Sequence, residues 1–368
     1  MIPVNRPLIS QADIDFVLGE LEAGFISGEI PLIGELEKEF SRYLGVSESV
    51  AVSNGTVALD LLVNAFDIKE GDTCIVPSFT IISTINELVR RKAKIIFVDS
   101  EPGSWNMNSA EAISVINSRT KAIFPVHIYG LPVDLDPILD AVAGTSIKII
   151  EDAAEALGVE YKGRKIGSLG HASTFSFYAN KIITGGEGGM ISTSDSSIAQ
   201  QLRLDRTLNF RVGERFVSDN LGWNSRIHGL SAALIFSQLK RLDALVEAKK
   251  KIAARYLNGL AGHPWFTFQL AQTDYSENTY WVFGLLLSND SPFDAENFQR
   301  ILRENGIESR RFFCPMHLQP VLKDYDFKVS SNMYMSERLW KNGVYIPSGL
   351  GMTELEQEKI ISTLWSLI

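Results

Sequence analysis

Short apolar runs alternate with amphipathic segments along most of the chain. Segments such as residues 36–43 repeat apolar side chains every three or four positions, which predicts helices. The apolar runs are four to six residues long and bounded by turn or helix signals, which predicts buried strands. These runs are residues 50–53, 73–76, 94–99, 121–126, 147–150, 174–178 and 189–193. The alternation of the two patterns predicts an α/β protein.

A long helical pattern over residues 229–254 marks the expected change of domain. Leu239, Leu242 and Leu245 lie among Lys and Arg residues there, as in an amphipathic helix. We place the boundary inside this segment, so that residues 1–245 form a large domain and residues 246–368 a smaller one. The smaller domain is expected to contain one strand and two helices, at residues 280–287, 295–304 and 354–367.

Composition narrows the class of protein. The 368 residues are 45% hydrophobic and 21% charged, which is typical of a globular protein with a sizeable core. The net charge is -9, so a broad cationic surface for nucleic acid or anionic membrane is not expected. The N-terminus has no apolar signal core, and no stretch is long enough to cross a bilayer. We therefore expect a cytoplasmic protein, in which an anionic ligand needs a local pocket.

The two cysteines, Cys74 and Cys314, lie far apart and match neither a zinc nor a redox spacing. They predict unpaired thiols in a reducing compartment and no metal site.

Asn54-Gly55-Thr56 follows a predicted strand and opens a predicted helix. The backbone N–H groups at the start of a helix, together with the Thr56 hydroxyl, could bind a phosphate. Turns of this composition are also common helix caps, so the motif alone leaves both interpretations open.

Glu151 and Asp152 end another predicted strand, where open parallel sheets place their ligand-binding groups. A carboxylate at Asp152 that faced the cleft would keep a pyridine nitrogen protonated, because a nearby opposite charge favours the charged form. An Asp after a strand is also a frequent helix cap.

Lys181 follows the segment 175–180 and precedes a loop with four glycines between residues 185 and 189. Glycines let the backbone approach a bound ring closely. A Lys in such an apolar, glycine-flanked setting can be desolvated enough to become a nucleophilic amine.

Together with three further segments, these motifs resemble the DegT/DnrJ/EryC1/StrS family of fold-type-I, pyridoxal-phosphate (PLP) dependent nucleotide-sugar aminotransferases. The resemblance extends along essentially the whole chain. It is carried by residues 53–59, 76–80, 125–130, 151–158, 175–181 and 222–226. It implies a large domain built on a mixed, mostly parallel sheet and a smaller C-terminal α+β domain.

The same resemblance implies roles for individual residues. Lys181 would carry PLP through a Schiff base, and Asp152 would pair with the pyridine nitrogen. Thr56, the backbone of Val57, and Ser176 would hold the phosphate. L-glutamate would be the amino donor. Members of the family that dehydrate the sugar carry His in place of this Lys, so Lys181 favours amino transfer.

Asn224 would reach the phosphate from the neighbouring subunit, which implies a homodimer with shared active sites. The chain also departs from the family pattern at four places. Ile81 replaces an aromatic residue that stacks on the cofactor, and Glu155 stands near the cofactor hydroxyl where Gln or His is usual. Ser225 replaces one of two aromatic residues around Asn224, and Arg311 stands where Pro is usual; both departures concern substrate fit.

Residues 25–28, 129–138, 180–184 and 306–310 are most similar to the perosamine-synthase branch of the family. That branch aminates carbon 4 of GDP-4-keto-6-deoxy-D-mannose for surface polysaccharide synthesis. Arg226, Arg310 and His317 are candidate substrate-binding residues, and Tyr280 and Trp281 are candidates of the same standing as His317. A UDP- or dTDP-linked 4-keto or 3-keto sugar is the alternative substrate.

Two other functions are retained as alternatives: a PLP-dependent sugar dehydratase and a PLP-binding regulator. Residues 203–226 contain five Arg against three acidic residues. This excess suits a diphosphate better than a nucleic-acid duplex, and a solvated loop face would explain it equally well.

Overall fold

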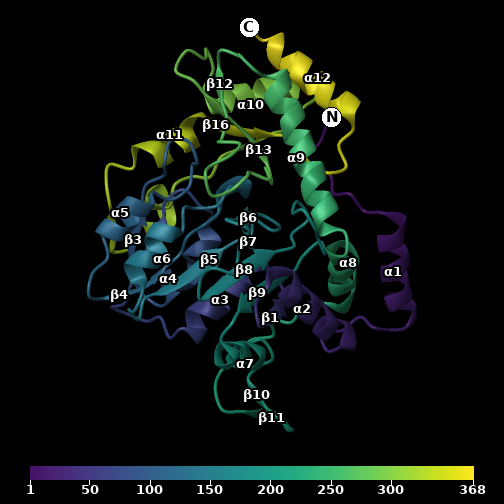
Figure 1. The fold of residues 1–368 in the computed structure, drawn as a ribbon, viewed down its shortest axis with the longest axis vertical. Coiled ribbons are helices and arrows are strands. Elements are labelled where there is room, and N and C mark those ends of the chain that lie inside the picture. Colours follow the sequence, from purple (N-terminus) through teal and green to yellow (C-terminus); the bar gives the residue numbers. More distant parts are fainter.

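An eight-stranded sheet lies at the centre of the computed structural model, which describes residues 1–368 (Figure 1). Strand β9 is antiparallel to both of its neighbours, and the other five neighbouring pairs are parallel. The order across the sheet is β1 (Glu48–Val52), β9 (Gly189–Thr193), β8 (Ala172–Ser176), β5 (Lys148–Asp152), β4 (Thr120–Ile123), β2 (Thr73–Pro77), β3 (Lys94–Val98) and β15 (Phe327–Val329). The expected mixed, mostly parallel sheet is confirmed.

Both faces of the central part of this sheet are covered, which explains why consecutive apolar residues of one strand pack on opposite faces. Ile149 packs on one face, with Phe40 of α2 (Pro31–Leu44). Ile150, the next residue along β5, packs on the other face with Leu62 of α3 (Gly55–Ala65). Helix α8 (Gly229–Leu239) covers the first face, and α7 (Ser196–Asp205) covers the second.

The C-terminal part of the chain forms a second, antiparallel sheet with its own core (Figure 1). Tyr256, Phe283, Phe298 and Ile360 meet in this core and are almost fully buried. Its elements are β12 (Phe266–Thr267), β13 (Phe283–Leu287), β16 (Gly343–Ile346), β14 (Arg310–Arg311), α9 (Leu242–Gly259), α10 (Ala295–Glu304) and α12 (Glu354–Trp365). This arrangement agrees with the expected α+β unit.

The single long helix expected over residues 229–254 is wrong. The structure has two helices there, because the backbone at Arg241 leaves the helical conformation between α8 and α9 (φ −121°, ψ 18°). The Arg241 guanidinium turns to the Asp13 carboxylate and to the carbonyl oxygen of Leu8. The expected boundary at 245/246 falls within α9 and stays a prediction, although β15 from the C-terminal part joins the large sheet beside β3.

The remaining elements connect these units. They are α1 (Gln11–Glu22), α4 (Asn86–Arg90), α5 (Ser109–Ser114), α6 (Asp136–Val142), α11 (Tyr334–Asn342), β6 (Glu160–Tyr161), β7 (Arg164–Lys165), β10 (Phe210–Arg211), β11 (Glu214–Ser218) and four short 3-10 turns. None of the helices is both long and apolar enough to cross a lipid bilayer.

Lys249 of α9 is an unusual feature of the packing between the two units. Its side chain is only 3% exposed, and its amine donates to the carbonyl oxygen and the hydroxyl of Ser348. No carboxylate pairs with it, and burial lowers the pKa of the amine to about 7. The folded protein therefore holds Lys249 largely neutral at alkaline pH, whereas the unfolded chain keeps the same residue protonated up to about pH 10.

We predict that Lys249 makes stability rise with pH above neutrality. Between the folded and unfolded pKa values the unfolded chain binds more protons, so the free energy of unfolding increases with pH. Relative to Lys249→Met, the wild type should gain about 2–3 kcal/mol between pH 7 and pH 9, as measured by urea unfolding. The exposed Lys251→Met in the same helix is the control and should follow the wild type. A wild-type and Lys249→Met difference that is constant with pH would contradict the assignment.

Candidate active site

A cavity of about 570 Å³ lies at the carboxyl ends of β5 and β8, the edge at which open α/β sheets bind ligands. It opens between the large sheet and the C-terminal unit, which contributes Trp281, Phe313 and Tyr345 to its wall. Six residues that the sequence predicts for the site line this one cavity: Thr56, Val57, Asp152, Glu155, Ser176 and Lys181. These six residues come from positions that span 125 residues of the chain, from Thr56 to Lys181.

One end of the cavity is suited to an anion. Helix α3 begins at Gly55, so the N–H groups of its first turn point toward this end without partners inside the helix. The Thr56 hydroxyl lies 2.8 Å from that of Ser83. The N–H of Val57 donates to Oδ1 of Asn54 at 2.9 Å, so this cap already occupies the amide that the sequence assigns to the phosphate.

The glycines after Lys181 permit a close approach of two backbone segments. A Cβ atom on Gly189 would lie 2.4 Å from the carbonyl oxygen of Asn54, and one on Gly55 would lie 3.0 Å from Cβ of Ser176. Any side chain at Gly189 would therefore push β9 away from the start of α3. The expected approach of these glycines to a bound ring stays a prediction; in the structure Gly189 brings the Asn54 turn against the sheet.

Lys181 projects into the cavity from the loop after β8. Its backbone N–H donates to the carbonyl oxygen of Tyr178 at 2.9 Å, and its amine lies 3.5 Å from the centre of the Trp281 ring. Trp281 is fixed in turn by its indole N–H, which donates to the carbonyl oxygen of Asn180 at 2.8 Å. Burial lowers the pKa of the Lys181 amine, while Glu155 and Asp152 oppose this shift.

Asp152 occupies the last position of β5 and is almost fully buried. Burial raises the pKa of its carboxyl group. Hydrogen bonds act in the opposite direction, because one oxygen accepts from the N–H of Ala154 at 3.2 Å and the other from the hydroxyl of Thr84 at 3.1 Å. These two donors fix the carboxylate in one orientation at the floor of the cavity.

Glu155 is the second buried carboxyl group in the cavity wall. One of its oxygens accepts from the backbone N–H of Tyr129 at 2.9 Å. Tyr129 has a positive φ of 56°, a backbone conformation that residues other than glycine rarely adopt. Burial raises the pKa of Glu155 to about 7. The negative charge of Asp152 also acts to raise this pKa, whereas the positive charge of Lys181 acts to lower it. The group can therefore change charge near neutral pH.

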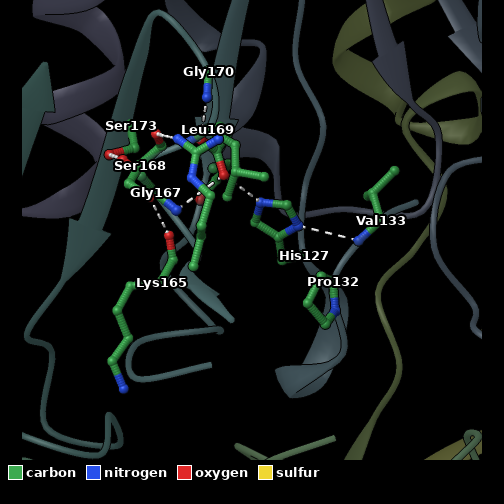
Figure 2. A network of polar contacts seen from close by, with 12 residues as sticks. His127, Pro132, Val133, Lys165, Gly167, Ser168, Leu169, Gly170 and Ser173 are labelled. Carbon is green, nitrogen blue, oxygen red and sulfur yellow. Dashed lines mark hydrogen bonds and ion pairs between the residues drawn. The ribbon is translucent and has the colours of Figure 1, made fainter. Parts of the chain in front are cut away.

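Glu151, the neighbour of Asp152, points to the opposite face of β5 and is completely buried. Its oxygens accept from His127 Nε2 at 3.2 Å and from the N–H groups of Gly167, Leu169 and Gly170 at 2.9, 2.9 and 2.6 Å (Figure 2). Burial opposes ionisation, but the hydrogen bonds of His127, Gly170 and Gly167 lower the pKa of this carboxyl group. Sequence reasoning did not assign Glu151 this role.

The orientation of His127 follows from its two contacts. Its Nδ1 accepts the N–H of Val133 at 3.1 Å, so the ring proton is on Nε2, which donates to Glu151. The backbone N–H of His127 also donates to the carbonyl oxygen of Asp152. This buried network therefore fixes the end of the strand that carries Asp152 (Figure 2).

Four other predicted residues lie outside the lining of the cavity. Asn224 is exposed, and Arg226 lies 3.7 Å from the carboxylate of Glu29. Arg310 is exposed and donates only to the carbonyl oxygen of Ser309. His317 has both ring nitrogens engaged, at 2.7 Å from the Ser78 hydroxyl and 3.2 Å from Glu337. Their assigned roles therefore stay predictions.

Known proteins resemble this chain over its full length. A model of the DegT/DnrJ/EryC1/StrS aminotransferase family matches residues 8–365. GDP-perosamine synthase of Caulobacter vibrioides is 36% identical over 99% of this chain and 97% of its own length. GDP-perosamine synthase of Vibrio cholerae is 34% identical over 99% of this chain and 98% of its own length.

The fold is shared with a solved structure of GDP-4-keto-6-deoxy-D-mannose-3-dehydratase from E. coli with bound hydrated PLP. The TM-score is 0.92 at 24% identity, and the match covers 99% of both chains. These matches agree with the fold. The chain therefore belongs to the DegT/DnrJ/EryC1/StrS aminotransferase family and is a PLP-dependent aminotransferase.

Proposed function

We propose that this aminotransferase moves an amino group from L-glutamate to carbon 4 of GDP-4-keto-6-deoxy-D-mannose, giving GDP-perosamine for surface polysaccharide synthesis in the cytoplasm. The observation that carries the aminotransferase chemistry is the placement of Lys181 with Asp152 and Glu155 in one cavity. The substrate is supported by the two GDP-perosamine synthases, which are 36% and 34% identical over nearly the whole chain.

The residues of the cavity fit PLP. The start of α3 and the hydroxyls of Thr56 and Ser176 would bind the phosphate group. The Asp152 carboxylate would pair with the pyridine nitrogen, and the Lys181 amine would bond to the aldehyde carbon. When bound, PLP supplies an acceptor for the amino group and for the electrons released when a carbon–hydrogen bond breaks.

Lys181 has two tasks in this chemistry. Its burial lowers the pKa of the amine, so a larger neutral fraction is present as the nucleophile that holds the cofactor. Once an amino donor displaces it, the same amine can take the proton from the donor's α-carbon and return a proton at the acceptor end. The contact with Trp281 at 3.5 Å holds the amine at the cavity wall.

Asp152 keeps the ring nitrogen of the cofactor protonated, because a buried opposite charge favours the charged form. The hydrogen bonds from Thr84 and Ala154 stabilise its ionised state against burial. In the overall reaction, glutamate becomes 2-oxoglutarate and the keto group becomes an amine. The two half-reactions balance each other, so no external oxidant or reductant is needed.

A UDP- or dTDP-linked 4-keto or 3-keto sugar is the second candidate acceptor. It is favoured by two residues at which the chain departs from the usual family pattern, Ser225 and Arg311. The presence of Lys at position 181 favours amino transfer over dehydration.

A homodimer with shared sites is part of the proposal. Asn224 lies outside the cavity of its own chain, next to the hairpin of β10 and β11. This region exposes large apolar side chains, namely Val212, Phe216, Leu221 and Trp223. A partner subunit would cover them, and Asn224 would then reach the phosphate in the partner's cavity.

A mixing experiment tests the shared site. Asn224→Ala should weaken PLP retention and activity, because it removes a charge-assisted hydrogen bond of about 1–3 kcal/mol. Lys181→Ala should be inactive. Mixed dimers of the two variants should regain activity, since one of their two sites contains both native residues. Absence of recovery, with subunit exchange verified by mass spectrometry of differently tagged chains, would contradict the shared site.

A competition assay tests the acceptor. PLP-loaded enzyme and L-glutamate are given equal concentrations of GDP-, UDP- and dTDP-linked 4-keto-6-deoxy sugars, and the products are read by mass. We expect the GDP sugar to have the highest kcat/KM, because unpaired polar groups on a mismatched base are costly. A tenfold preference for a UDP or dTDP sugar, about 1.4 kcal/mol, would replace the acceptor and leave the aminotransferase assignment intact.

A further inference from the structure

A second cavity, of about 610 Å³, lies between α11 and β14 and shares no lining residue with the active-site cavity. The start of α11 is fixed at the end of β3, because Asp99 accepts the N–H groups of Met335 and Ser336 at 2.9 and 2.8 Å. The carboxyl end of β3 belongs to the same edge of the sheet as that of β5. The start of α11 therefore lies at the same edge of the sheet as the active-site cavity.

The lining of this cavity is cationic. Arg311 of β14 and Arg338 and Lys341 of α11 contribute three positive charges against the single carboxylate of Glu337. Tyr334, Arg338 and Lys341 are spaced by four and three residues, so they lie along one face of α11. Such an excess of positive charge stands out in a chain with a net charge of -9.

These three cations have no acidic partner. None of them forms an ion pair with a carboxylate of the chain, and Arg311 donates only to the carbonyl oxygen of Trp340, at 3.0 Å. The Nε atoms of Arg311 and Arg338 are buried and have no hydrogen-bond partner at all. By contrast, Arg300 on α10 pairs with Glu304 at 2.9 Å. Unpaired cations around one cavity repel one another, and an anion in the cavity would offset this repulsion.

Two aromatic rings complete the lining, those of Tyr334 and Trp340. Trp340 lies against the Arg311 guanidinium, 5.6 Å from the ring centre, and Tyr334 is 63% exposed. Guanidinium groups match the geometry of phosphate oxygens, and aromatic faces offer a surface on which a base can stack.

We propose that this second cavity binds a phosphate-bearing anion, with Arg311, Arg338 and Lys341 as its ligands. The shared chemistry is a diphosphate group, which could belong to a nucleotide or to inorganic pyrophosphate. The proposal does not depend on the identity of the sugar acceptor. Arg311 stands where Pro is usual in the family, so its contribution to the site is a departure of this chain from the family pattern.

Calorimetry on the PLP-loaded enzyme tests the proposal, with inorganic pyrophosphate and GDP as the two probes. Loading with PLP fills the phosphate end of the active-site cavity before the titration. Arg311→Gln and Arg338→Gln should each weaken binding of at least one probe by tenfold or more, and high salt should weaken it further. The matched control is Arg300→Gln, which should bind like the wild type.

The pattern across the probes identifies the source of the diphosphate. If the variants lose binding of both pyrophosphate and GDP, the cavity is a general diphosphate site. If they lose binding of GDP alone, the cavity also binds the base. If GDP inhibits turnover competitively with the keto sugar and Arg338→Gln relieves this, the site holds the diphosphate of the substrate itself. Lys341→Gln, at an exposed position, replaces Arg338→Gln if the latter unfolds. Equal binding of both probes to the wild type and to all three variants would overturn the proposal.

Discussion

The structure depends on placing one amine and two carboxyl groups together in one cavity at the edge of the sheet. Burial lowers the pKa of Lys181 and raises those of Asp152 and Glu155. The Lys181 amine and the two carboxylates favour one another's charged forms, whereas the charge of Asp152 disfavours that of Glu155. Their charges are therefore set jointly. A cofactor with a ring nitrogen and an aldehyde would offer Asp152 and Lys181 a partner each, which explains how these polar groups can be buried at acceptable cost.

The surrounding fold holds these groups still. His127 and the loop 167–170 saturate Glu151 and thereby fix the end of β5, so that Asp152 has a rigid base. From the other side, Trp281 brings the C-terminal unit against Lys181. The active site is thus built on the sheet and covered by the second unit. PLP-dependent amino transfer needs both units, because the reacting atoms must be held at fixed positions relative to one another.

The local sequence is enough to predict those site residues that lie at or just after the end of a strand. Thr56, Asp152, Ser176 and Lys181 each follow or end an apolar run, so their meeting at one edge of the sheet could be anticipated. Other features depend on partners far away in the chain. The break between α8 and α9 is fixed by Asp13, 228 residues from Arg241, and β15 pairs with a strand more than 200 residues earlier. No local pattern encodes such contacts, and the same holds for the contact between Lys181 and Trp281.

The central claim is that Lys181, and no other buried amine, carries the cofactor. Reduction of the PLP-loaded enzyme with borohydride makes the bond between lysine and cofactor permanent, and mass spectrometry of the digested protein then locates it. The account predicts the pyridoxyl group on the peptide that contains Lys181. Lys249 is the informative comparison, because it is also buried, has a lowered pKa and lies beside Lys181 around a small internal space. A pyridoxyl group on Lys249, or on no single lysine, would contradict the account.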